Sequence, residues 1–152
     1  KFRFDMACAG RLGMELQPRQ MEDGERAFAR RAIASYKDYR EIVLQGDLYR
    51  IGTPYDRSGC YAVLYVSKDK QRAVLFTYCL QYQGRSLRPK FRLRGLDPQT
   101  TYRIRELNIE KPRFGFDGRT FSGSLLAEAG IEPALSKLYD SGVFLLEAVE
   151  TE

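Results

Sequence analysis

Two closely spaced glycines in the stretch "ACAGRLGMELQP" are the first residues that could do chemistry. Gly10 and Gly13 follow a short apolar run. A glycine pair after a strand can bind phosphate on backbone N–H groups, or it can be the turn that joins a barrel strand to its helix. A Walker loop needs a Lys-Ser/Thr pair after its second glycine, where this chain has Met14-Glu15. A dinucleotide fingerprint needs a third glycine where Leu16 stands, so the turn is the favoured interpretation.

Catalytic side chains are scarce. The chain contains no histidine, which removes the usual general base and the commonest metal ligand. Five carboxylates lie beside glycines, at turns or at strand starts, where such groups usually bond to their own backbone: Asp5, Glu15, Asp47, Asp97 and Asp140. We therefore assign no catalytic, cofactor-binding or metal-binding residue and expect no cofactor.

The three cysteines, Cys8, Cys60 and Cys79, are widely spaced and form no CxxC motif. A zinc site is therefore not expected. Each lies in an apolar or alternating run, which predicts buried thiols and weakly indicates a reducing compartment.

The composition is that of one globular domain. The chain has 152 residues, 43% hydrophobic and 30% charged, with a net charge of +5. The basic-aromatic stretch "RSLRPKFRLRGL" could bind nucleic acid by stacking a base on Phe91. We favour an edge strand kept soluble by positive charge, and expect neither a nucleic-acid nor a membrane partner.

A strand-like run that ends in the glycine pair occupies part of residues 1–20, and residues 22–45 have the period of a helix. The helix has Asp23 as its expected N-cap and Gly46 as its stop. Its apolar stripe is predicted to be Phe28, Ala32, Ser35, Tyr36, Tyr39 and Val43.

From residue 47 the period changes to two, which predicts strands. A hairpin loop at 67–71 and a brief helical turn within 119–133, capped by Ser122 or Ser124 and stopped by Gly130, interrupt them. Such short strands predict an antiparallel sandwich or barrel. The expected strands are 47–51, 60–66, 72–82, 90–96, 101–107 and 141–149.

Four stretches together resemble the C-terminal end of glycoside hydrolase family 36, the α-galactosidase family. The first three are "AGRLGMEL", "YKDYREIVLQGDLYRIGTP" and "CYAVLYVSKDKQRAVLFTYCL". The fourth combines "RLRGLDPQTTYRIREL", "FSGSLLAEAGIEP" and "DSGVFLLEAV". Their order and spacing cover essentially the whole chain.

The resemblance implies a mainly β fold: a Greek-key β-sandwich over 47–152, after a truncated last barrel strand and loop (1–20) and the last helix (21–46) of a (β/α)8 barrel. The chain starts at Lys1 rather than Met, and we expect it to be the C-terminal fragment of a longer enzyme.

The resemblance also implies that the parent is a retaining hydrolase of terminal α-galactosides such as melibiose or raffinose, without metal or organic cofactor. The family nucleophile lies in a Lys-Trp-Asp stretch, and this chain has no tryptophan. The fragment is therefore expected to be inactive and to brace the catalytic barrel. Arg11 would lie beyond a strand end, where active sites are built, and we expect it to pair with a barrel carboxylate rather than to contact the sugar. A homo-oligomer and a cytoplasmic location are expected, with a periplasmic or secreted location left open. The alternative is a free-standing carbohydrate- or anion-binding module.

Overall fold

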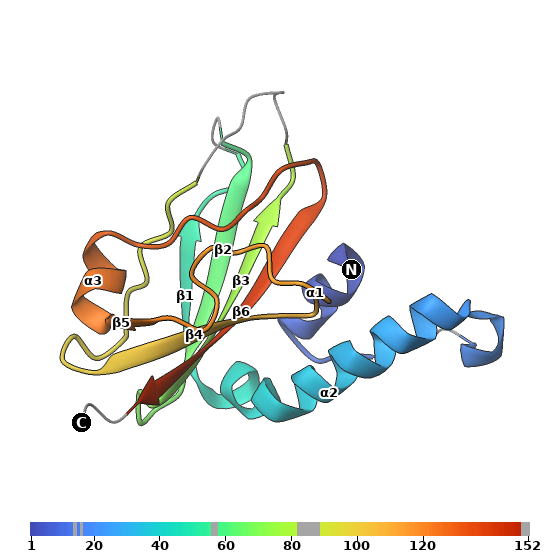
Figure 1. The fold of residues 1–152 in the computed structure, drawn as a ribbon, viewed down its shortest axis with the longest axis horizontal. Coiled ribbons are helices and arrows are strands. Elements are labelled where there is room, and N and C mark those ends of the chain that lie inside the picture. Colours follow the sequence, from blue (N-terminus) through green and yellow to red (C-terminus); the bar gives the residue numbers. More distant parts are fainter. Residues whose placement is uncertain (14, 16, 56–57, 82–88, 150–152) are drawn as a thin grey trace.

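A computed structural model describes residues 1–13, 15, 17–55, 58–81 and 89–149. One β-sheet carries helices and irregular segments on its two faces (Figure 1). The elements in chain order are α1 (Phe2–Cys8), η1 (Pro18–Gln20), α2 (Asp23–Gln45), β1 (Asp47–Gly52), β2 (Cys60–Val66), β3 (Arg72–Cys79), β4 (Thr101–Leu107), β5 (Thr120–Ser122), α3 (Gly123–Glu128) and β6 (Asp140–Val149).

The sheet has six strands in the order β1-β2-β3-β6-β4-β5, and every pair is antiparallel. The last strand, β6, lies between β3 and β4, so the C-terminal strand is central. β3 and β6 are buried almost throughout, which is why their sequences are continuous apolar runs, whereas β4 alternates buried and exposed residues. The predicted mainly β, antiparallel fold is confirmed.

The first face of the sheet is covered by α3 and by the segments around residues 91–96 and 131–135. They bury an apolar core that includes Leu64, Leu75, Ile104 and Leu146. This layer is held by backbone bonds: Phe91 forms a bridge with Ile131. The sandwich thus has one regular sheet and one irregular layer.

The predicted strand at 90–96 is wrong as a regular strand. Only Phe91 pairs as in a sheet, and the Leu93 N–H donates to the carbonyl of Leu126 in α3 at 2.9 Å. A helical residue cannot continue a strand ladder, so the alternating pattern here packs Phe91 and Leu93 on the core without forming a seventh strand.

The long helix α2 forms as predicted, but its N-cap is Glu22 rather than Asp23. Glu22 and Glu25 form a capping box, in which the side chain of each residue accepts the backbone N–H of the other. Gly46 ends the helix, and its N–H donates to the Ile42 carbonyl at 2.8 Å. The buried residues of α2 are Ala29, Ala32, Tyr36, Tyr39, Ile42 and Val43.

The expected barrel strand at the N-terminus is not a strand here, because Phe2–Cys8 form helix α1. A parallel barrel strand needs hydrogen-bonded neighbours on both edges, and the described residues supply none for this segment. As a helix the segment places Phe2, Asp5 and Cys8, spaced three apart, toward the sheet.

The other predicted elements agree closely with the structure. The Ser122 side chain caps α3 by accepting the Leu125 N–H at 3.2 Å, and Gly130 follows the helix with a φ of 71°. The 67–71 loop joins β2 to β3, while the end of the predicted 72–82 strand lies outside the described residues. No helix in the described part of the chain is long and apolar enough to span a membrane.

Candidate functional site

The second face of the sheet carries α1 and α2 and is the candidate contact surface of the molecule (Figure 1). Side chains of β3 and β6 pack there against Tyr36, Tyr39, Ile42 and Val43 of α2. The Tyr39 ring meets the Phe76 ring edge-on, with centroids 5.9 Å apart. The C-terminal half of α2 is therefore covered by the sheet itself.

Three tyrosine hydroxyls fix the backbone of the N-terminal segment. Tyr65 donates to the carbonyl of Ala9 at 2.7 Å and Tyr36 to that of Gly10 at 2.9 Å. Tyr78 donates to the carbonyl of Asp5 at 3.1 Å. The first of the two glycines thus offers an acceptor to a tyrosine, which is a structural role.

The Asp5 carboxylate is buried and bonded to distant parts of the chain. It accepts from the Ser141 hydroxyl at 2.7 Å and from the Asn108 side-chain amide at 2.9 Å, and it forms an ion pair with Lys1. Each of its oxygens therefore has a donor, as a buried carboxylate requires. These bonds join α1 to β6 and to the residue that follows β4.

Cys8 lies on the same face beside Tyr39. Burial raises the pKa of the Cys8 thiol to about 11, with a smaller opposing effect of the Tyr39 hydroxyl and a further increase from the charge of Asp5. Burial likewise raises the pKa of Tyr39. Both groups are neutral near pH 7, so neither is a nucleophile or a base there.

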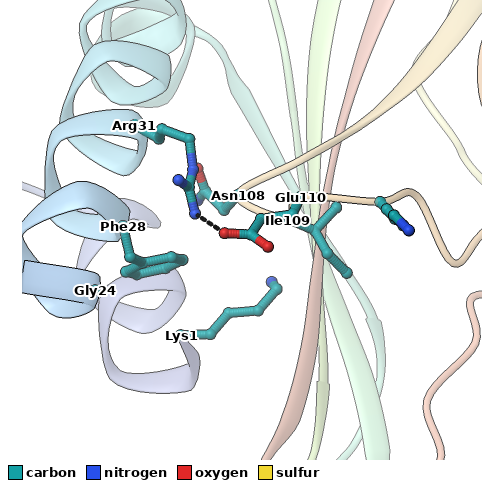
Figure 2. A pocket seen from close by; sticks show the side chains of 8 residues that line it. Lys1, Gly24, Phe28, Arg31, Asn108, Ile109 and Glu110 are labelled. Atoms are coloured by element: carbon teal, nitrogen blue, oxygen red, sulfur yellow. Dashed lines mark hydrogen bonds and ion pairs between the residues drawn. The ribbon is translucent and has the colours of Figure 1, made fainter.

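The N-terminal half of α2 extends past the sheet and borders an open groove of about 470 Å³ (Figures 1 and 2). Phe28 and Arg31 of α2 face the segment from Asn108 to Lys111 across this groove, and Arg31 pairs with Glu110 at 3.2 Å. The Phe28 ring also meets the Phe4 ring, with centroids 5.5 Å apart. We call this groove, lined by α2, Lys1 and residues 108–111, the α2 groove.

A second groove of about 700 Å³ lies beside the edge strand β1. Half of its eight lining residues are basic: Arg50 on β1, and Lys90, Arg92 and Arg94 in the segment after residue 89. Lys90 is paired with Glu132 at 3.4 Å, and the three arginines have no ion pair within the described residues. We call it the basic groove. An anionic ligand of this domain would be expected to bind in this groove.

Comparison with known proteins gives the family. The sequence profile described as "Glycosyl hydrolase family 36 C-terminal domain" matches residues 60–146, more than half of the chain. The chain belongs to glycosyl hydrolase family 36. It is similar to a probable α-galactosidase C of Aspergillus flavus, with 34% identity over 149 residues. It is also similar to a bifunctional α-galactosidase/sucrose kinase of Mediterraneibacter gnavus, with 30% identity over 139 residues.

These alignments cover 97% and 91% of the chain but only 18% and 14% of the two relatives. Solved structures also match nearly all of this chain and only a small part of a longer protein. The family 36 α-galactosidase AgaA of Geobacillus stearothermophilus matches with a TM-score of 0.82 at 28% identity, over 97% of this chain and 19% of AgaA. The chain therefore corresponds to the C-terminal domain of family 36 α-galactosidases, without the catalytic barrel.

Four of the five carboxylates singled out in the sequence make contacts with other described residues of this domain, and the exception is Glu15. Asp47 pairs with Lys68, Asp97 accepts the Gln99 N–H, and Glu15 is exposed. Only Asp5 and Asp140 come together, because Asp140 accepts the N–H of the same Ser141 whose hydroxyl bonds Asp5.

No metal-binding group of three or more ligands occurs in the part of the chain that the structure describes. Arg11 is exposed and has no ion pair with another described residue.

Sequence reasoning did not find the bonds of Asp5 or the role of Asn108. Asp5 is separated from Asn108 and Ser141 by more than a hundred positions, and a turn-like residue such as Asn108, whose φ is 57°, gives no sign of a buried contact. Helical periodicity placed Tyr36 on the apolar stripe, but the backbone acceptors of Tyr36, Tyr65 and Tyr78 depend on the helical course of α1.

Proposed function

We propose that this chain is the C-terminal domain of a longer, α-galactosidase-like retaining glycoside hydrolase, and that it braces the catalytic (β/α)8 barrel. The observation that carries the proposal is the fixed N-terminal segment. Asp5, Tyr65 and Tyr78 attach it to the sheet, and Tyr36 attaches it to α2. A segment that enters from a barrel would be held at a defined position by these bonds.

In this proposal, the chemistry belongs to the barrel. A retaining enzyme places two carboxyl groups about 5–5.5 Å apart on either side of the scissile bond. Asp5 and Asp140 are both buried and bonded to donors of this domain, so a substrate cannot reach either of them as a nucleophile or as an acid. The host is proposed to release terminal α-linked galactose from oligosaccharides, and to need no metal for it.

The α2 groove is the proposed contact for the barrel. Phe28 is only partly buried there, and covering such a side chain contributes up to about 1.5–3 kcal/mol. Arg11, exposed between the two glycines, is proposed to pair with a barrel carboxylate. Association of host copies into a homo-oligomer is also part of the proposal.

The experiment compares the host chain, the host without these 152 residues, and this chain alone, all assayed with p-nitrophenyl α-galactoside. We expect turnover by the host, no turnover by this chain, and loss of soluble active enzyme on truncation. Turnover by this chain that persists through repurification would contradict the assignment. A truncated host with full activity and heat resistance would contradict the bracing role.

A binding module is the second candidate, and the basic groove is the observation that favours it. Its three arginines, which form no ion pair with another described residue, would attract an anionic ligand. The same experiment separates the two roles, because a module is dispensable for host stability.

A further inference from the structure

Two of the three cysteines face each other across the β2–β3 hairpin. The register pairs Cys60, the first residue of β2, with Cys79, the last residue of β3. Both side chains are buried in the core on the face of the sheet that carries α3, with 3% and 2% exposure. They therefore project from the same face of the sheet.

The ladder hydrogen bonds show which kind of pair this is. The Ser67 N–H donates to the Arg72 carbonyl at 2.8 Å, and the Leu80 N–H donates to the Gly59 carbonyl at 2.8 Å. These two hydrogen-bonded pairs lie at opposite ends of the hairpin, and bonded and non-bonded pairs alternate between them. The pair Cys60–Cys79 directly follows Gly59–Leu80, so it is a non-hydrogen-bonded pair.

Such a pair brings two side chains close enough for a disulfide. Cα atoms of non-hydrogen-bonded pairs are about 4.5 Å apart, within the roughly 4.4–6.8 Å range of disulfides. Their Cβ atoms lie about 4.5–5.5 Å apart, at or just beyond the disulfide range of about 3.5–4.5 Å. A small approach of the two strand ends is enough to close the bond.

We propose that Cys60 and Cys79 form an oxidisable dithiol, a modification site that a small disulfide oxidant such as glutathione disulfide converts to a cross-strand disulfide. One cysteine thiolate attacks the oxidant, releasing one glutathione and leaving a mixed disulfide. The second cysteine then attacks the protein sulfur of that mixed disulfide and releases the second glutathione. Two thiols are oxidised and one disulfide is reduced, so electrons and protons balance.

The position of the pair suits this reaction. The Cys79 thiol donates to the Gln81 carbonyl at 3.2 Å, and rotation toward Cys60 gives up only this weak bond. Both residues are at strand ends, where local opening needs less free energy than in the middle of a sheet. A bond formed with some strain is also readily reduced, so the site is expected to be reversible.

Cys8 is an internal control for this proposal. It lies in the core between α1, α2 and the sheet, on the opposite face from Cys60 and Cys79. The sheet separates it from both, so the odd cysteine is expected to stay a thiol. Its raised pKa, about 11, also makes it a poor attacking group near pH 7.

The test refolds the reduced chain in glutathione buffers with graded ratios of glutathione disulfide to glutathione, and treats native chain in parallel. Remaining thiols are alkylated after unfolding, and peptides are mapped by mass spectrometry. We expect a Cys60–Cys79 peptide, about 2 Da lighter for the two hydrogens lost, with Cys8 alkylated. Cys8→Ser should keep this product, and Cys60→Ser and Cys79→Ser should each abolish it.

Three results would overturn the proposal. They are three alkylated thiols in the most oxidising buffer after refolding, a product in which Cys8 is linked to Cys60 or Cys79, and glutathione adducts at Cys60 or Cys79 without the cross-strand bond. Because the thiols are exposed before refolding, a missing bond in the refolding experiment cannot be explained by slow access of the oxidant to buried thiols.

Discussion

Asp5 connects α1 to two other parts of the chain through a single buried carboxylate. Asp5→Ala leaves the Ser141 hydroxyl, the Asn108 amide and Lys1 without their acceptor. We expect a loss of about 3 kcal/mol in the free energy of unfolding, measured by urea denaturation. Asp23→Ala, which removes only an exposed ion pair with Arg26, should cost less than about 1 kcal/mol. Equal losses for both variants would contradict the role of Asp5.

Asp140 should make stability depend on pH. Burial raises the pKa of its carboxyl, but the Ser136 N–H and the Arg113 guanidinium oppose this and together lower the pKa below its usual value. Arg113 bonds both carboxylate oxygens, at 3.0 and 3.1 Å. Because the folded-state pKa is depressed, this stabilisation is present above the unfolded pKa of about 4 and is lost as pH falls through the folded value.

Asp140→Asn is therefore expected to lower the free energy of unfolding by about 2 kcal/mol at neutral pH. The difference from the parent chain should shrink as urea titrations are repeated from pH 6 down to about pH 3. Asp38→Asn, at a more exposed ion pair with Arg72, is the matched control and should show a small effect. A difference for Asp140→Asn that does not change with pH is the contrary result.

The individual site residues were the least predictable part of this chain. Local pattern placed Tyr36 and Tyr39 on the apolar stripe and Ser122 at a cap, because these roles depend on neighbours within four positions. The contacts of Asp5 and the pairing of Arg113 with Asp140 depend on strand order, since β6 inserts between β3 and β4. No local spacing encodes that insertion.

At the scale of elements, the junction between α2 and β1 leaves no room for a side chain at Gly46. A Cβ at Gly46 would lie 2.5 Å from the Ile42 carbonyl oxygen and 2.6 Å from that of Val66. Gly46→Ala must displace backbone, and we expect a loss of at least about 2 kcal/mol in the free energy of unfolding. Gly24→Ala, where nothing lies within 4 Å, should be neutral or gain up to about 1 kcal/mol from helix propensity. Similar melting temperatures for the two variants would refute this account of the junction.

The elements themselves were largely predictable. Five of the six expected strands and both expected helices exist, because alternation and a three-to-four-residue stripe are set by burial on one face. The failures share a cause. The 90–96 segment and the N-terminal run have the composition of strands, but a strand also needs a partner strand. The 90–96 segment bonds to α3 instead, and the N-terminal run packs as a helix against α2 and the sheet.

At the scale of the whole molecule, the basic groove decides between a bracing domain and a binding module. We expect the affinity for a single-stranded oligonucleotide to be weak and non-specific, with dissociation constants of about 10⁻⁶–10⁻⁴ M at physiological salt. Fluorescence anisotropy over a salt series measures it, with Arg92→Glu/Arg94→Glu compared with Arg30→Glu/Arg40→Glu on α2. Tight binding lost only in the groove variant would favour the module instead.

The α2 groove carries the central claim that this domain stabilises a catalytic barrel without supplying catalytic groups. Phe28→Asp places a charge in that groove, and Leu125→Asp places one on exposed α3, which covers the other face of the sheet. Both changes are made in the host chain and in this chain alone, so that the loss of the Phe28–Phe4 contact is measured separately.

The deciding measurement is the melting temperature of the host, together with its kcat and KM on p-nitrophenyl α-galactoside. We predict that Phe28→Asp lowers the melting temperature of the host more than that of this chain alone and leaves kcat and KM unchanged. Leu125→Asp should show no such extra loss in the host. A host whose melting temperature falls no more than that of the isolated chain, or whose kcat falls while its stability is unchanged, would contradict the account.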